Sequence, residues 1–73
     1  MKKVIVIEDM DNMPMGNAIS RILESISGVD KTKLYLEKES IVVEYERGVL
    51  TEDELCDAIN DEGFEVADIF DEV

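Results

Sequence analysis

The chain has no histidine, no tryptophan, one proline and a single cysteine, Cys56, among its 73 residues. One cysteine excludes an internal disulfide and a thiolate metal cluster within one chain. The absence of histidine removes the side chain most often used for proton transfer near neutral pH. The chain also lacks any apolar run approaching the ~18 residues of a membrane span, and residues 4–7 are too few for the core of a signal peptide. We therefore expect a cytoplasmic protein.

Basic residues are scarce, because nineteen Asp and Glu stand against seven Lys and Arg and leave a net charge of −12. Nucleic acids and anionic membranes are negatively charged themselves, so neither is an expected partner. A protein with a basic surface, or a cation, is the more natural counterpart, unless the acids serve only to keep a small protein soluble. Most of the carboxylates fall on expected solvent faces, and no phosphate loop or nucleophile motif is present. We predict that the protein is not an enzyme.

Apolar residues in the first half recur with the periods of a strand and then of a helix. The β-branched run at residues 4–7 predicts a strand. The next apolar residues have the spacing of one helix face: Ile19, Ile22, Leu23 and Ile26. Asp11 or Asn12 is placed to cap the start of this helix, and Gly28 is expected to end it.

The second half predicts a hairpin, a helix and a last strand. Residues 32–36 and 41–45 alternate in polarity on either side of a polar turn, which is typical of two paired strands. Thr51 and Glu54 form a capping-box pattern before a second helix, and Gly63 is expected to end it.

A less regular strand at residues 64–70 completes the order βαββαβ. We predict one α+β domain spanning residues 1–73, with a four-stranded antiparallel sheet and both helices on one face, the ferredoxin-like arrangement.

The loop between the first strand and the first helix carries three of the four methionines. Met10, Met13 and Met15 form an M-x-x-M-x-M cluster, and Asp9 and Asp11 lie within it. Thioether sulfurs are soft ligands that suit Cu(I) or Ag(I), whereas carboxylates suit hard cations. A calcium loop is disfavoured because the glycine and glutamate of the EF-hand pattern are absent.

Several short motifs follow one another along the chain: residues 7–10, Ile19, Ile22, Leu23, Gly28, Val29, 43–45, Ala58, Ile59, Gly63 and Phe64. In this order and at these intervals, they resemble the heavy-metal-associated domain of copper chaperones and metal-pumping ATPases. The resemblance covers nearly the whole chain and implies soft-metal binding or delivery.

The metal motif departs from that family. The family binds metal with two cysteines, and Asn12 and Met15 stand at their positions, while Asp9 replaces a glycine. If Cu(I) or Ag(I) binds, the resemblance and the thioethers together make Met13 and Met15 the expected ligands, with Met10 secondary. The alternative is a degenerate domain that binds no metal and acts as an acidic protein-interaction or regulatory module.

The face of the sheet away from the helices is expected to be apolar. If Ile5 points toward the helices, alternation sends Val4, Val6, Tyr35 and Val42 outward. A contiguous apolar patch on a small protein often marks a partner surface. We predict a homodimer or a docking surface there, the alternative being an exposed strand that is merely β-prone. Cys56 is expected to be half-buried beside the core.

Overall fold

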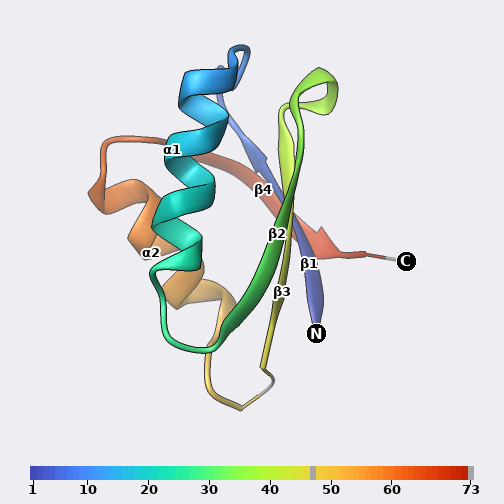
Figure 1. The fold of residues 1–73 in the computed structure, drawn as a ribbon, viewed down its shortest axis with the longest axis vertical. Helices are drawn as coiled ribbons and strands as arrows, with labels where there is room; N and C mark the ends of the chain where they lie inside the picture. The colour runs from blue at the N-terminus through green and yellow to red at the C-terminus, as the bar shows by residue number, and fades with distance from the viewer. Residues whose placement is uncertain (47, 73) are drawn as a thin grey trace.

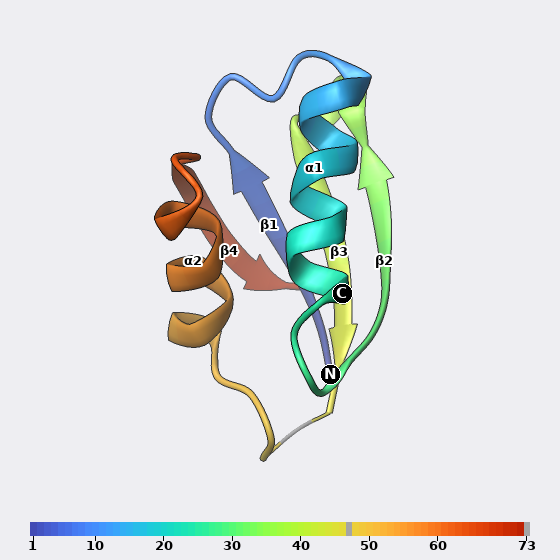
Figure 2. The same cartoon turned by 60° about the vertical axis from the view of Figure 1, so that its left-hand side comes forward.

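A four-stranded antiparallel sheet in the order β2-β3-β1-β4 carries both helices on one face (Figures 1 and 2). The computed structural model describes residues 1–46 and 48–72. Its elements are β1 (Lys2–Ile7), α1 (Met13–Glu24), β2 (Val29–Tyr35), the short 3-10 turn η1 (Leu36–Lys38), β3 (Ser40–Tyr45), α2 (Glu52–Asp61) and β4 (Val66–Asp71). The predicted ferredoxin-like βαββαβ fold is confirmed. Within the described part of the chain, no helix combines the length and the apolar character needed to cross a membrane.

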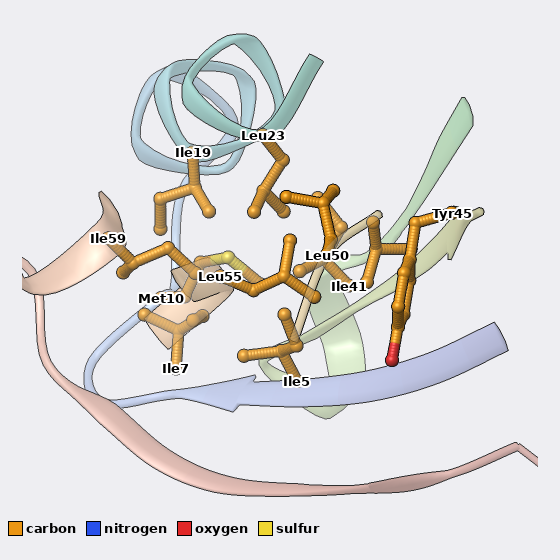
Figure 3. Packing of buried hydrophobic residues seen from close by; sticks show 11 residues of the cluster. Ile5, Ile7, Met10, Ile19, Leu23, Ile41, Tyr45, Leu50, Leu55 and Ile59 are labelled. Atoms are coloured by element: carbon orange, nitrogen blue, oxygen red, sulfur yellow. The ribbon is translucent and has the colours of Figure 1, made fainter. Parts of the chain in front are cut away.

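The core lies between the sheet and the two helices. Ile5 and Ile7 of β1 are fully buried, whereas Val4 and Val6 on the opposite face are partly exposed. The buried cluster is aliphatic apart from one methionine and one tyrosine (Figure 3): Ile5, Ile7, Met10, Ile19, Leu23, Ile41, Val43, Tyr45, Leu50, Leu55 and Ile59. Period-two alternation therefore sorts the strands into an inner and an outer face, as the sequence predicts.

The end of α1 differs from the prediction. The helix stops at Glu24, where the hydroxyl of the capping Ser25 donates a hydrogen bond of 2.7 Å to the carbonyl of Ile22. Gly28 lies beyond the helix, in the turn before β2, with a positive φ of 103°. A Cβ at this position would lie 2.8 Å from Val49. Gly28 is thus a tight-turn residue rather than the cap of α1.

The hairpin and the second helix agree more closely with the elements predicted from the sequence. Thr51 caps α2, since its hydroxyl accepts a hydrogen bond of 3.3 Å from the backbone N–H of Glu54. Gly63 follows the helix with a φ of 91°, a conformation that glycine adopts at little cost. Leu36 was expected in the second strand but begins η1, because the chain turns one residue earlier. The last strand begins at Val66 rather than at residue 64.

A buried lysine on the inner face of the sheet was not predicted. The side chain of Lys3 is only 8% exposed and forms ion pairs with Glu52 at 2.6 Å and with Asp71. Hydrogen bonds to Asp71 and then to Glu52 raise the pKa of Lys3 above its ordinary value. This triad joins β1 to the first residue of α2 and to the end of β4.

Candidate metal-binding loop

The loop after β1 is tied at its start to two neighbouring segments. The backbone N–H of Ile7 donates a hydrogen bond of 2.8 Å to the carbonyl of Glu39, and the N–H of Glu8 donates one of 2.9 Å to the carbonyl of Glu65. Asp9 then adopts a φ of 59°, in the left-handed region that aspartate tolerates better than most residues. The chain direction at this point is therefore fixed by backbone contacts.

Asn12 ends the loop by capping α1. Its side-chain oxygen accepts a hydrogen bond of 2.9 Å from the backbone N–H of Met15, and its amide donates one of 3.1 Å to Asp11. Its carbonyl also accepts a hydrogen bond of 3.1 Å from the N–H of Gly16. These are the contacts of an N-cap residue, which satisfies helix-start donors that have no partner within the helix. Asn12 thus has a structural role independent of any metal.

The three loop methionines lie in three different environments. Met10 is fully buried in the core, where Figure 3 shows its sulfur among the aliphatic side chains. Met13, the first residue of α1, is 51% exposed. Met15 is half-buried and packs against the core cluster. Residues two apart on a helix do not face each other, so Met13 and Met15 do not converge on one point. The predicted thioether cluster is therefore not preformed.

Carboxylates surround the exposed side of the loop. An open hollow of about 600 Å³ lies between the loop and the β2–β3 turn, and its lining includes the carboxylates of Asp11, Glu37 and Glu39. Across the described residues, however, no three His, Cys, Asp or Glu side chains are grouped so that they would hold a metal ion. The acidic surroundings can offset the unfavourable effect of the helix N-terminus on a cation, but they do not form a hard-cation site.

The single thiol, that of Cys56, is a weak candidate for binding a soft metal ion in place of the methionines. Cys56 lies on α2 and is half-buried, as the sequence predicts. Burial and then the neighbouring Asp53, Glu52 and Asp57 raise the pKa of its thiol. Because the thiolate is the metal-binding form, Cys56 is poorly suited to hold a soft ion at neutral pH.

Two curated relatives match most of this chain. The copper chaperone CopZ of Enterococcus hirae is 38% identical over 56 residues, which cover 73% of this chain and 81% of that protein. The copper chaperone CopZ of Staphylococcus haemolyticus is 30% identical over 64 residues, which cover 88% of this chain and 94% of that protein. The chain belongs to the heavy-metal-associated family. A solved CopZ metallochaperone superposes on it with a TM-score of 0.85 at 25% identity, covering 92% of this chain and all of the other. No protein-family model matches the chain.

Membership of the heavy-metal-associated family explains the shape of the loop. The resemblance matches Asp9 to a glycine before the family's methionine, and the φ of Asp9 lies in the left-handed region that favours glycine. The family's inward-pointing methionine corresponds to Met10, which is fully buried here. The resemblance leads us to expect Asn12 and Met15 at the positions of the family's two cysteines.

The outer face of the sheet carries the predicted apolar patch. Val4, Val6, Tyr35 and Val42 line a shallow groove of about 340 Å³ on this face. Phe70 of β4 joins them and is 47% exposed, which the sequence analysis missed. The available signal was the alternation of residues 68, 70 and 72 around the half-buried Ile69.

Proposed function

We propose that this domain binds or delivers a soft metal ion, Cu(I) or Ag(I), through its altered methionine loop. The proposal is supported by the family, whose matching members are named copper chaperones. The observation that carries it is the exposed thioether of Met13 at the start of α1, next to the position that a metal-binding cysteine occupies in the family. Delivery of an ion requires no catalytic residue, in line with the prediction that the protein is not an enzyme, and we keep the predicted cytoplasmic location as part of the proposal.

Met13 and Met15 are the proposed ligands, and bringing their sulfurs together requires the first turn of α1 to open. Helix ends fray readily, and among the described residues the one side-chain hydrogen bond that holds this turn runs from the backbone N–H of Met15 to Asn12. Ion binding should therefore break this hydrogen bond. Met10 is a secondary ligand, because its sulfur would first have to leave the core. Asp9 and Asp11 supply outer negative charge.

The test is a titration with Ag(I), and with Cu(I) under reducing conditions, followed by NMR of the methionine methyl groups. We expect selective shifts at Met13 and Met15, accompanied by a shift of the Met15 backbone amide. Changing both to leucine should abolish binding. Met1 is 47% exposed, nearly the same as Met13, and so serves as an internal control for non-specific thioether binding.

Absence of methyl shifts at high micromolar metal would reject this proposal. Equal shifts at Met1 and Met13 would reject it too, because they would indicate non-specific contact. Since thioethers have no proton to lose, the affinity should change little with pH, unlike that of a thiolate site.

The second candidate function is an acidic interaction or regulatory module that binds no metal. It is favoured by the capping role of Asn12, which explains this residue without any ion. The first turn of α2 consists of Glu52, Asp53 and Glu54, so a protein with a basic surface is the proposed partner. The homodimer through the outer sheet face is also kept as a proposal. A folded protein that gives no methyl shift in the titration would favour this second function.

A further inference from the structure

The outer face of the sheet is arranged in three rows that run across the strands. The registers of β2 with β3, β3 with β1, and β1 with β4 place one residue of each strand in each row. Glu72 extends the first row, because its backbone N–H bonds to the carbonyl of Lys2. Read from β2 to β4, the rows are Lys31, Glu44, Lys2 and Glu72; Lys33, Val42, Val4 and Phe70; and Tyr35, Ser40, Val6 and Asp68.

Charge is distributed unevenly across these rows. The β2 edge carries Lys31 and Lys33, and the β4 edge carries Asp68 and Glu72. Lys38 adds to the basic side, since its Nζ lies 5.8 Å from the centroid of the Tyr35 ring. Between the two edges, Glu44 and Lys2 fill the middle of the first row, whereas Val42, Val4 and Val6 line the middle of the other two rows beside Ser40.

The outer face is also nearly neutral, in a chain whose net charge is −12. Four lysines on it (2, 31, 33 and 38) stand against three carboxylates (44, 68 and 72). The remaining surface therefore carries all of the excess negative charge. The rest of the surface carries more electrostatic repulsion between two copies of the chain, so this face is the one that favours their approach.

We propose that two copies of this domain pack outer face against outer face, about a two-fold axis that runs along the strands. Such an axis places the β2 edge of one copy on the β4 edge of the other, so that lysines meet carboxylates on both sides. An axis running across the strands would instead place lysines on lysines. A two-fold interface uses the same patch twice and must be self-complementary, and this face is self-complementary in the first orientation only.

In this arrangement, each row of one copy lies over the same row of the other copy, and the two rows run in opposite directions. In the first row, Lys31 of one copy faces Glu72 of the other. In the second row, Lys33 faces the ring of Phe70, a cation–π arrangement, and Val42 faces Val4. In the third row, the hydroxyl of Tyr35 faces the carboxylate of Asp68. This match of charge and apolar residues within each row is the reason for assigning a second copy of the chain to the apolar patch.

The area of the outer face indicates how stable such a dimer would be. Four strands about 4.8 Å apart and six residues long make a face of roughly 20 Å by 20 Å. Two copies therefore bury on the order of 1,000 Å², near the lower limit of specific interfaces. We expect a transient dimer that forms between micromolar and millimolar concentration and weakens as salt screens its edge contacts.

Sedimentation of the metal-free protein, with reductant present so that Cys56 cannot crosslink, tests the proposal. At low salt the wild type should shift from monomer to dimer as concentration rises, and Val42→Lys should remain monomeric. Val49→Lys is the matched control, because Val49 is 53% exposed but lies outside the outer face. This variant should dimerise like the wild type.

A charge exchange gives the decisive measurement. Lys31→Glu with Lys33→Glu makes both edges acidic, and Asp68→Lys with Glu72→Lys makes both edges basic. Each double variant alone should remain monomeric, and an equal mixture of the two should form a heterodimer. Amide NMR spectra establish that each variant is folded. A wild type that stays monomeric at millimolar concentration, or a mixture that stays monomeric, would overturn the proposal, and neither result bears on metal binding.

Discussion

The backbone N–H of Met15 donates a 2.9 Å hydrogen bond to the side-chain oxygen of Asn12. The resemblance leads us to expect these two residues at the positions of the two cysteines in the heavy-metal-associated family. Positions three apart at a helix start converge, which suits two thiolates on one ion and equally suits a cap and its donor. In this chain the two positions are joined as a helix cap and its donor.

Asn12→Cys combined with Met15→Cys should therefore restore a strong soft-metal site. The two thiolates would replace a neutral amide and a thioether on a backbone that already has the family's shape. Thiols must lose protons on binding, so the variant should release protons when Ag(I) is added, and its affinity should rise with pH. Isothermal titration in buffers of different ionisation enthalpy measures this release.

The wild type is the control for that experiment, and it should release no protons on binding. Met13→Cys with Met15→Cys is a matched variant whose two sulfurs lie two residues apart. It should bind more weakly than the restored pair, because its side chains leave the helix on different sides. Equal affinity of the two variants would contradict the convergence argument.

Asn12→Ala should destabilise the domain by about 1 kcal/mol, the usual loss when a helix cap is removed. The cause is the unpaired N–H of Met15 at the start of α1. Denaturant unfolding measures the change in free energy. Asn12→Ser is the control, since its hydroxyl accepts the same bond without adding a charge beside Asp11, and it should be nearly neutral. If Asn12→Ala left the stability unchanged, the cap would have no energetic role.

From the sequence, the local features of the loop can be predicted better than the three-dimensional arrangement of its side chains. Asn12 could be recognised as a possible cap because the side chain and the donor it serves are three residues apart. The M-x-x-M-x-M spacing suggested a thioether cluster, but the cap makes Met13 the first helical residue and so separates the sulfurs of Met13 and Met15. The burial of Lys3 was not predictable, because its partners Glu52 and Asp71 are about fifty and seventy residues away. The outer-face valines were predictable from alternation alone.

Met10→Ala should cost about 2–5 kcal/mol, as is usual when a fully buried methionine is truncated. The residue lies in the core cluster with no exposed surface. Met13→Ala should change the free energy of unfolding by less than about 0.5 kcal/mol, because that side chain is half exposed. Thermal and denaturant unfolding of the two variants measures the change in stability and so distinguishes the buried methionine from the exposed one. Equal effects would show that Met10 is not a core residue.

Gly28→Ala should be more harmful than Gly63→Ala, although both glycines have a positive φ. Gly63 has no atom near the position of an added Cβ, so the variant should lose only about 1 kcal/mol for the left-handed backbone. At Gly28 the Cβ would also lie 2.8 Å from Val49 and 3.3 Å from Leu50, which adds a clash with the core edge. We expect a loss of at least about 2 kcal/mol there. Denaturant unfolding measures the free energy of unfolding of both variants. Equal losses of stability would contradict a clash between a Cβ at position 28 and Val49.

The Lys3 triad should show itself at alkaline pH. The pKa of Lys3 is raised by its bonds to Asp71 and Glu52 above its ordinary value of 10.5. A group that holds its proton more tightly in the folded state contributes its full stabilisation below its unfolded pKa and loses it as the pH rises toward the folded value. The difference in unfolding free energy between wild type and Lys3→Met should therefore be constant from about pH 7 to about pH 9.5 and shrink above 10.5.

Lys31→Met is the control for this experiment. The Lys31 side chain is 75% exposed, and its ion pair with Glu44 is long at 3.7 Å. This control should show only a small difference, as exposed ion pairs usually do. A Lys3 difference that disappears already below pH 9 would contradict the raised pKa.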